Sequence, residues 1–351
     1  MSVYWHEHAK AFIAANNLTS QNFRAHAARG SHTDYVLAAA RDRGLRVEKL
    51  GMGHYFYQDD KIIGGMRSML SSVVSSIAVS ISANKTLTKS FLDSAGVPTP
   101  QGKSFKVKDF ENASDYFQTF TSPVVVKPVD GSAGDGVSSG VASHEQFLRA
   151  WDRAARATVS YGSVLIEKHI AGIDVRAFVV GSRVVAAATR LPVFVIGDGK
   201  KTISTLVEEK RSLRDTNAYL TRMPIVIDDE WLETTGLSLE YVLRDGEVSI
   251  LNPTVNLHQG GENIDITDQL CPELQEIAVR AAESIPGLRV AGIDLLVRSP
   301  HTAEGAVVLE ANTKANIAVH QLPAYGDAVN VGPAIVDEML TDANVCADRV
   351  A

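Results

Sequence analysis

The sequence predicts a folded protein that mixes helices with strands and contains two or three domains. Its 351 residues are more than one ordinary hydrophobic core supports, and 45% hydrophobic with 21% charged residues is a usual globular composition. Residues 34–44 have the apolar spacing of a helix and residues 45–50 that of a strand, which is the rhythm of an α/β unit. We therefore expect a small α/β domain over residues 1–81.

Charge and targeting signals narrow the range of partners. The formal net charge is −7 and the lysines and arginines are scattered, so we expect no surface for nucleic acid or an anionic membrane. The longest low-charge run, residues 68–83, is shorter than a membrane span and rich in serine, which favours a buried helix or strand. The first residues lack the apolar core of a signal peptide, and Cys271 and Cys346 fit no disulfide or zinc pattern. These features predict a cytoplasmic protein with a small-molecule or peptide partner.

The second domain, expected over residues 82–163, begins with a well-delimited helix. Ser82 can cap the start of this helix, and Gly96 followed by Pro98 can end it. The other expected elements are strand 123–128, helix 143–155 and strand 163–170. A glycine-rich loop, 130-DGSAGDG-136, follows the first of these strands.

The third domain is expected over residues 164–351. Residues 174–181 and 183–190 have the pattern of two strands joined by a tight turn at Gly181, which predicts a hairpin. The polar stretch 197–222 follows, and we expect it to form a flap or excursion. The remaining expected elements are strand 247–255, helix 272–285, strand 290–297 and strand 306–312.

The glycine loop matches neither of two common phosphate-binding motifs. A P-loop places its lysine after the glycines, whereas Lys127 precedes them here. A dinucleotide fingerprint spaces its glycines as GxGxxG, whereas this loop reads GxxGxG. Two interpretations remain: a flexible loop whose amides approach an anion near Lys127 and Lys85, or an ordinary turn.

Two carboxylates lie inside apolar strands near the end of the chain. Burying an ionised carboxylate without a partner is expensive, so Asp294 and Glu310 each need a cation, a hydrogen bond or an open cleft. Glu310 and Asn312 share one face of a strand, and Asp294 can join them if the two strands are neighbours. Three such oxygen ligands suit Mg²⁺ bound together with nucleotide phosphates. The alternative is a buried salt bridge from a carboxylate to Arg176 or Arg190.

The segment 165-LIEKHIAGID-174 is a strand that ends in a bend. Its backbone could bind adenine, with Glu167 near the exocyclic amine and Asp174 near the ribose hydroxyls. The alternative is an ordinary strand with exposed charges.

Taken in order, these segments resemble the ATP-grasp enzymes over about residues 30–340. The resemblance rests on NK at 84–85, VVVKP with its glycine loop, LIEKHIAGID, AGID and LEAN. It is closest to the ATP-grasp modules of cyanophycin synthetases and bifunctional glutathione synthetases, through 191-LPVFVIGDGKKTI-203, 221-TRMPIVID-228 and 255-VNLHQGGENIDITD-268. The ending 310-EANTKANIAVHQLPAYG-326 resembles the glutathione-type module more. Because the larger partner halves of both enzymes are missing, we expect a standalone ligase module.

The resemblance implies an α+β ATP-grasp fold, in which an N-terminal α/β domain precedes two α+β subdomains that sandwich ATP. It implies an ATP-dependent carboxylate-amine ligase: a carboxylate takes the γ-phosphate, an amine attacks the acyl phosphate, and ADP and phosphate leave. The implied cofactors are ATP and two Mg²⁺ ions, with Mn²⁺ as a substitute. The implied partners are a small carboxylic acid and an amine, amino acids or peptides, and a second copy of the chain is the default oligomeric partner. The alternatives are other acyl-phosphate or phosphoryl chemistry, and a non-catalytic nucleotide-binding module.

The resemblance also assigns residues to roles. The implied ATP contacts are Lys85, Lys127, Ser132, Ala133, Gly134, Gly136, Glu167, Lys168, Ile170 and Asp174. The implied Mg²⁺ ligands are Asp294, Glu310 and Asn312. The implied catalytic residues are Arg190, Arg176 and Lys127, with no general base assigned. The implied substrate contacts are Asn256, His258, Gly260, Gly261, His320 and Tyr325, for some of which packing is the alternative. Arg24, Arg29 and His32 could meet a substrate carboxylate, with solvent exposure as the alternative.

Overall fold

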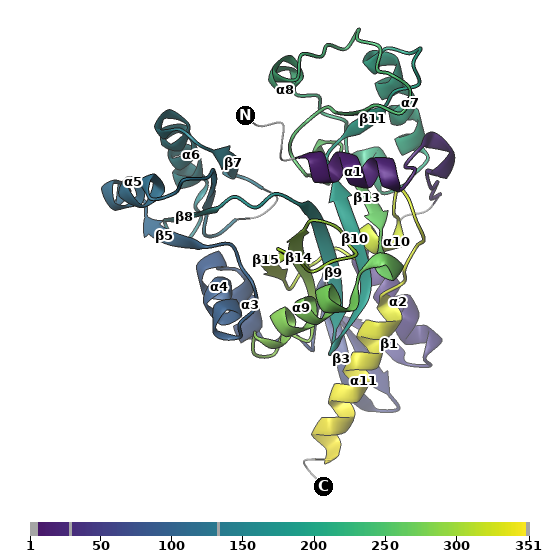
Figure 1. Ribbon diagram of the computed structural model, residues 1–351. Coiled ribbons are helices and arrows are strands. Elements are labelled where there is room, and N and C mark those ends of the chain that lie inside the picture. Colours follow the sequence, from purple (N-terminus) through teal and green to yellow (C-terminus); the bar gives the residue numbers. More distant parts are fainter. Residues whose placement is uncertain (1–5, 28–29, 132–133, 349–351) are drawn as a thin grey trace.

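The computed structural model of the protein, shown in Figure 1, describes residues 6–27, 30–131 and 134–348. Side chains are described as far as residue 343. The expected site residues Ser132, Ala133 and Arg29 lie outside the described residues.

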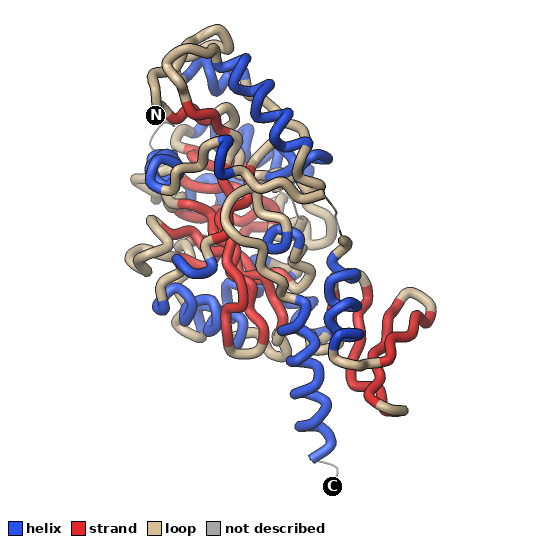
Figure 2. Tube along the Cα trace, turned by 90° about the vertical axis from the view of Figure 1, so that its right-hand side faces the viewer, coloured by secondary structure: helices blue, strands red, loops and turns tan. Residues whose placement is uncertain are grey.

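The N-terminal part consists of a four-stranded antiparallel sheet and two helices. Its elements are α1 (Glu7–Ala15), η2 (Ser20–Asn22), α2 (His32–Asp42), β1 (Arg46–Leu50), β2 (Gly53–Gln58), β3 (Lys61–Arg67) and β4 (Leu70–Ser71). The strands pair in the order β1-β2-β3-β4, and the C-terminal helix α11 (Gly332–Asp348) packs against both α2 and β3. Figure 2 shows this sheet at one side of the molecule, beside α11. Its buried residues share one hydrophobic core with the C-terminal sheet.

Two short helices, α3 (Ser76–Ser82) and α4 (Lys85–Ser94), lead to the central part of the chain. The expected cap was wrong by two residues: the side chain of Asn84 accepts a hydrogen bond from the Leu87 amide at 3.0 Å. Ser82 instead ends α3. The low-charge run, residues 68–83, therefore contains the whole of α3, and α4 begins only after it.

The central subdomain has its own sheet and core. Its elements are β5 (Gly102–Lys106), α5 (Phe110–Gln118), β6 (Val124–Pro128), β7 (Ser138–Val141), α6 (His144–Ala157) and β8 (Ser163–Lys168). The strands are antiparallel in the order β5-β8-β6-β7, so the sheet runs past the boundary expected at residue 163. The rings of Phe117 on α5 and Phe147 on α6 stack 4.5 Å apart in the core beneath both helices.

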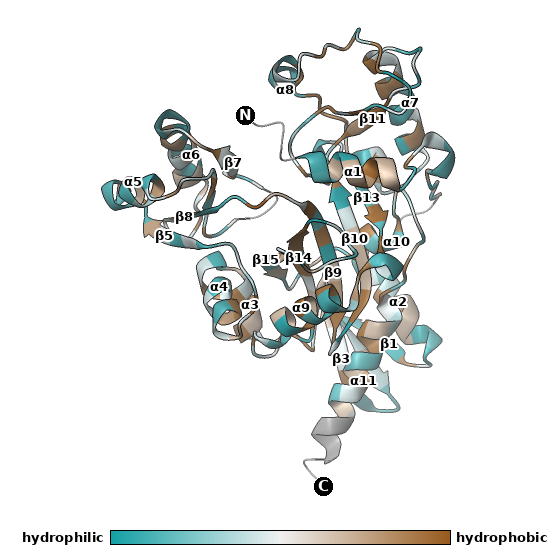
Figure 3. Ribbon diagram, viewed as in Figure 1, coloured by the Kyte–Doolittle hydropathy of each residue, from teal (hydrophilic) through white to brown (hydrophobic). Residues whose placement is uncertain are grey.

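The C-terminal subdomain is built on a five-stranded antiparallel sheet in the order β13-β10-β9-β14-β15. Its strands are β9 (Ile173–Val180), β10 (Arg183–Leu191), β13 (Glu262–Asp265), β14 (Val290–Val297) and β15 (Val307–Asn312). The accompanying helices are η4 (Leu257–Gln259), η5 (Thr267–Gln269), α9 (Pro272–Glu283) and α10 (Ala318–Gln321). The expected hairpin at Gly181 is the β9-β10 pair. Figure 3 shows β14 and β15 as mostly hydrophobic, so the two carboxylates are exceptions within these strands.

A small packed unit separates β10 from β13 in the sequence. We call residues 193–251, which carry its core, the insertion. Its elements are β11 (Phe194–Ile196), α7 (Ile203–Asp215), η3 (Leu220–Arg222), α8 (Asp229–Thr234) and β12 (Val248–Ile250). The stretch expected to be a flap therefore contains a helix, α7, with a buried face. His6, which precedes α1, packs on the insertion, and the centroid of its ring lies 5.2 Å from that of Trp231.

The described helices include none that is long and apolar enough to cross a membrane.

Candidate active site

The expected phosphate-binding lysines lie where the central subdomain meets the C-terminal sheet. The Nζ atom of Lys85 donates a hydrogen bond to the Gly131 carbonyl at 3.2 Å, and it lies 3.4 Å from Oε1 of Glu310. One cation thus touches both the glycine loop and a carboxylate far along the sequence. The Lys85 backbone is fixed as well, because its amide donates to the Val129 carbonyl at 3.0 Å.

Lys127 is buried beside Glu167 on the neighbouring strand. The Nζ atom lies 2.5 Å from Oε1 of Glu167, and both side chains are almost wholly buried. Burial disfavours the charge on Lys127, but the carboxylates of Glu167 and Glu310 outweigh it and raise the pKa of this lysine. The structure therefore gives Glu167, an expected adenine contact, an ionic partner within the protein.

The space between the two sheets is small in this structure. A cavity of about 10 Å³ is lined by α4, β8 and β15, including Lys85, Glu167 and Leu309. This volume is about that of one water position, so this cavity is too small for adenine as it stands. The Lys168 amide, another expected adenine contact, donates to the Gln101 carbonyl at 2.8 Å, and Ile170 lies half-buried just beyond β8.

Two arginine-aspartate pairs lie on one face of the C-terminal sheet. Arg176 donates from Nε and Nη2 to the two carboxylate oxygens of Asp294, at 2.8 and 2.7 Å. Arg190 donates in the same way to Asp174, at 2.5 and 2.8 Å, and also to Asp294 at 3.1 Å. Burial opposes the charge on Asp294, but the two guanidinium groups outweigh it and lower the pKa of this carboxyl to about 2. Asp174, expected at the ribose, is half-buried in this ionic group.

The expected Mg²⁺ ligands lie together, but they are not equally free. The Asn312 side-chain amide donates to Oδ2 of Asp294 at 3.2 Å, and the register pairs Asp294 directly with Glu310. Both oxygens of Asp294 already accept hydrogen bonds from Arg176, which is the buried salt bridge named as the alternative. Glu310 is half-exposed, and its one described ion pair is with Lys85. Within the described chain, no three His, Cys, Asp or Glu side chains form a metal-binding group. Glu310 and Asn312 therefore fit Mg²⁺, and Asp294 can join them through Oδ1, which accepts one described hydrogen bond, from Arg176.

Gly292 makes room for the Arg176 side chain. A Cβ atom at this glycine would lie 2.5 Å from Cβ of Ala315 and 3.3 Å from Cδ of Arg176. Because residue 292 pairs with Phe178 and Asn312 on the neighbouring strands, this space belongs to the face that carries the ion pairs.

The expected substrate contacts divide into two groups. Asn256, His258, Gly260 and Gly261 lie in one turn, in which Asn256 Oδ1 accepts a hydrogen bond from the His258 amide at 2.9 Å and the His258 side chain is exposed. A Cβ atom at Gly261 would lie 2.6 Å from the Leu191 carbonyl, so this turn abuts the strand that carries Arg190.

His320 and Tyr325, by contrast, are buried, which favours packing, the stated alternative to substrate contact. His320 has no exposed surface and lies edge-on to Phe178, with ring centroids 5.7 Å apart. Burial, with the charges of Arg176 and Arg190, lowers the pKa of His320 to about 3, so its imidazole is neutral. Burial likewise raises the pKa of Tyr325.

Of the two described N-terminal candidates, His32 is neither at a substrate surface nor exposed, whereas Arg24 has the solvent exposure given as its alternative. His32 is buried, and burial lowers its pKa to about 4, although a hydrogen bond to the backbone of Ala315 opposes the shift. Arg24 is exposed and donates to the Gly326 carbonyl at 3.0 Å.

Sequence reasoning missed a buried ionic group formed by Lys210, Arg214 and Glu262. The four-residue spacing of the two cations places them on one face of α7, and this spacing was the available signal. Their position in a charge-rich stretch made a solvated surface the natural interpretation.

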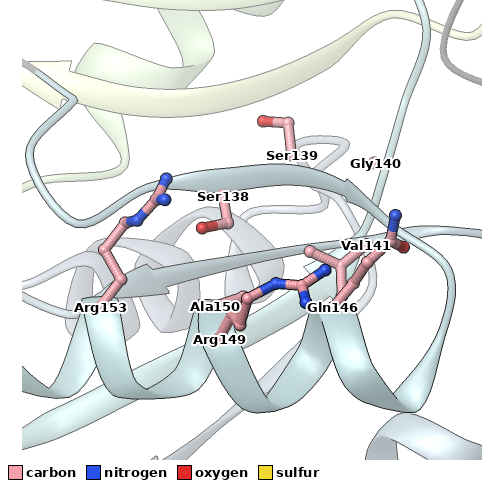
Figure 4. Close-up of a pocket in the computed structure, with 8 residues that line it drawn as sticks. All are labelled: Ser138, Ser139, Gly140, Val141, Gln146, Arg149, Ala150 and Arg153. Carbon is pink, nitrogen blue, oxygen red and sulfur yellow. The ribbon is translucent and has the colours of Figure 1, made fainter. Parts of the chain in front are cut away.

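A larger cavity, of about 170 Å³, lies between β7 and α6 (Figure 4). Ser138, Ser139, Arg149 and Arg153 are among its lining residues, and none of the expected site residues lines it. It is therefore separate from the lysine and carboxylate cluster.

Comparisons with known proteins find one matching family model and two groups of relatives. The family described as phosphoribosylglycinamide synthetase, ATP-grasp (A) domain, matches residues 83–203. The chain is 30% identical over 338 residues to cyanophycin synthetase from Geminocystis herdmanii, which covers 92% of this chain and 38% of that protein. It is 30% identical over 273 residues to the glutathione biosynthesis bifunctional protein from Clostridium perfringens, which covers 74% of this chain and 34% of that protein.

A solved structure supports the fold. The bifunctional glutathione synthetase from Pasteurella multocida aligns with a TM-score of 0.64 and 24% identity, over 89% of this chain and 44% of that chain. The chain spans less than half the length of each of these proteins.

Proposed function

We propose that this chain, an ATP-grasp protein related to the ATP-grasp portions of cyanophycin synthetases and bifunctional glutathione synthetases, is an ATP-dependent carboxylate-amine ligase. Its fold is the α+β ATP-grasp fold. The observation that carries the proposal is the contact of Lys85 with both the Gly131 carbonyl and Glu310. This contact brings a cation, the glycine loop and a half-exposed carboxylate together, as phosphoryl transfer from a nucleotide requires.

In the proposed reaction, a substrate carboxylate attacks the γ-phosphate of ATP and becomes an acyl phosphate, and ADP leaves. An amine then attacks the acyl carbon, an amide forms, and phosphate leaves. Lys85 and Lys127 bind phosphate oxygens, and the glycine loop closes over them to exclude water. Arg190 and Arg176 stabilise the acyl phosphate through their positive charge, while Nε and Nη2 of each guanidinium remain bound to Asp174 or Asp294.

Magnesium fits beside these residues. Glu310 and Asn312 would hold it, with Asp294 as a third ligand through Oδ1, which also accepts a hydrogen bond from Arg176. The proposal includes two Mg²⁺ ions, replaceable by Mn²⁺, which neutralise charge on the transferring phosphoryl group.

The proposed substrates are amino acids or small peptides, and the proposed reaction belongs to specialised metabolism. The proposed enzyme is a cytoplasmic homodimer. The two groups of relatives are named for different products, so neither product is carried over to this chain. The burial of His320 and Tyr325 supports a proposal in which the Asn256–Gly261 turn, with its exposed His258 side chain, contacts the substrate.

The test is a phosphate-release screen of amino acids and short peptides, supplied as all pairs with ATP and Mg²⁺, followed by mass spectrometry of the product. The proposal expects ADP formation that needs both an acid and an amine, with a product lighter than the two substrates by one water. Hydroxylamine in place of the amine should give a hydroxamate. A phosphorylated alcohol without hydroxamate would instead indicate a kinase-like reaction, and no turnover with any pair would indicate a non-catalytic module.

A further inference from the structure

A buried ionic cluster joins the insertion to the edge of the C-terminal sheet. Lys210 and Arg214 lie one turn apart on α7, and Glu262 is the first residue of β13. Nζ of Lys210 lies 2.8 Å from Oε2 of Glu262, and Nη1 of Arg214 lies 3.6 Å from Oε1. The exposed fractions are 9%, 2% and 0%, so all three charges are removed from solvent.

Arg214 contacts more than the carboxylate. Its Nη1 donates to the carbonyls of Gly260 and Gly261, both at 3.0 Å, and its Nη2 donates to the Met223 carbonyl at 2.8 Å. A planar guanidinium holds several acceptors at fixed relative positions, which a lysine ammonium on a flexible stem does not do. Arg214 therefore fixes the Gly260–Gly261 turn against the insertion.

The turn itself has little freedom. Gly260 has φ of +99°, and a Cβ atom there would lie 2.8 Å from Cα of Ile225. At Gly261, the corresponding atom would lie 2.6 Å from the Leu191 carbonyl. The backbone of the turn thus packs directly against the insertion on one side and against β10 on the other.

This packing leads to Arg190. In the β10-β13 register, Leu191 pairs with Glu262 and Arg190 pairs with Asn263. Glu262, which Lys210 and Arg214 bind, is therefore the neighbour in β13 of Asn263, the residue that pairs with Arg190. A shift of the turn would move the strand pair that carries this guanidinium.

Stability alone accounts poorly for the cluster. Two cations and one carboxylate are buried together, and replacing such groups with apolar residues often leaves stability unchanged or raises it. Nζ of Lys210 lies 3.7 Å from the centroid of the Phe194 ring, which offsets part of the cost of the second cation. What an apolar group cannot replace is the set of three carbonyl contacts made by Arg214.

We propose that Arg214 is a positioning residue for the ligase reaction: through the Gly260–Gly261 turn it fixes the strand pair that carries Arg190 at the acyl phosphate. This inference rests on the proposed function. Arg214 does not touch the reacting groups, and the insertion serves as a support for the reaction centre that is built into the chain between β10 and β13.

The experiment compares Arg214→Lys, which keeps the charge, with Arg211→Lys as the matched control. Arg211 lies on the same helix and pairs with Glu208 on the exposed side. Hydrogen exchange of residues 256–262 is measured without substrate, where the amides of Gln259 and Gly261 donate to the Asn256 carbonyl and that of Gly260 to the Leu257 carbonyl. ADP affinity, melting temperature and the rate of hydroxamate formation are measured on the same samples.

For Arg214→Lys we expect exchange in 256–262 to be about 10-fold faster and hydroxamate formation to be slower by about 10- to 100-fold. ADP affinity should stay within about twofold of the wild type, since the phosphate-binding lysines are unchanged. The proposal is overturned if Arg214→Lys matches Arg211→Lys in exchange and rate, or if ADP binding falls as much as the rate. If the wild type gives no hydroxamate with any acid, the proposed function fails. The exchange data still test separately whether Arg214 fixes the Gly260–Gly261 turn. Equal exchange rates in the two variants would show that it does not.

Discussion

Arg176 on β9 and Asp294 on β14 are joined by two parallel hydrogen bonds, 2.8 and 2.7 Å long, across directly paired positions of neighbouring strands. This fork-to-fork contact holds the carboxylate ionised within a hydrophobic strand, and it fixes the orientation of the guanidinium. Any Mg²⁺ that binds Asp294 must therefore share this carboxylate with Arg176, and Oδ1, which accepts one described hydrogen bond, is the less occupied oxygen.

The space beside Arg176 gives the first prediction. Gly292→Ala adds a methyl group 2.5 Å from Cβ of Ala315 and 3.3 Å from Cδ of Arg176. Overpacking of this kind costs about 1–3 kcal/mol, and we expect the free energy of unfolding, measured in urea, to fall by that amount. Hydroxamate formation should also slow by about 10-fold, because Arg176 moves. The double variant Gly292→Ala with Ala315→Gly, which removes the Cβ atom 2.5 Å from the added methyl group, is the control for the steric clash. If the double variant does not recover hydroxamate formation, the steric explanation is contradicted.

The metal assignment gives the second prediction. Glu310→Gln removes a charge that would face Mg²⁺ while keeping the side chain's shape. We expect ADP formation to fall by at least about 100-fold, and the Mg²⁺ concentration for half-maximal rate to rise. The free energy of unfolding should change by less than about 1 kcal/mol, because the only described ion pair lost is partly exposed. Glu304→Gln, which removes an exposed partner of Arg298, is the matched control. An unchanged Mg²⁺ dependence in Glu310→Gln would remove Glu310 from the metal site.

The buried imidazole of His32 gives a pH prediction. Its pKa is about 4 in the folded protein and about 6.5 when unfolded, so between these values the unfolded chain binds a proton that the folded chain does not. The free energy of unfolding should therefore fall as the pH drops from 6.5 to 4, with His32 contributing at most about 3 kcal/mol. Above pH 6.5 this contribution is constant.

The measurement for His32 is urea unfolding of His32→Gln at pH 7.5 and pH 4.5. The variant should lose less stability between the two values than the wild type, because glutamine does not titrate. His301→Gln, at an exposed loop position, should keep the wild-type difference. If both variants show the same pH dependence, His32 does not contribute in this range.

Much of the fold could be predicted because its signals are local. The β9-β10 hairpin follows from two alternating segments around Gly181, and helix α6 follows from the capping residue Ser143 and the apolar face behind it. The cap of α4 was misplaced by two residues because Ser82 and Asn84 are both good caps, and only the end of α3 separates them.

The site was predicted less completely because its contacts depend on strand order. The sequence alone allowed Asp294 to be either a metal ligand or a partner of arginine. Only the placement of β14 beside β9 shows that Arg176 binds it. In the same way, no local pattern separates a histidine that faces a ligand from one that packs on Phe178, as His320 does. The cluster around Glu262 could not be predicted because Lys210 and Glu262 are 52 residues apart in the sequence.

The glycine loop gives the last prediction, which separates backbone conformation from packing. Gly134 and Gly136 both have positive φ, +79° and +71°, so an alanine at either position costs about 1–2 kcal/mol in backbone strain. A Cβ atom at Gly134 would meet nothing within 4 Å, whereas one at Gly136 would lie 2.5 Å from Cβ of Ala157 and 3.2 Å from Cδ of Pro128.

Gly136→Ala should therefore reduce the free energy of unfolding by about 1–3 kcal/mol more than Gly134→Ala does. Because Pro128 follows Lys127, the displacement should also raise the KM for ATP, by about 10-fold, in Gly136→Ala. Urea unfolding and ATP titrations of the two variants measure these differences. If Gly134→Ala raises the KM as much as Gly136→Ala, then the freedom of the loop backbone, rather than its packing on α6, controls how the chain holds the nucleotide.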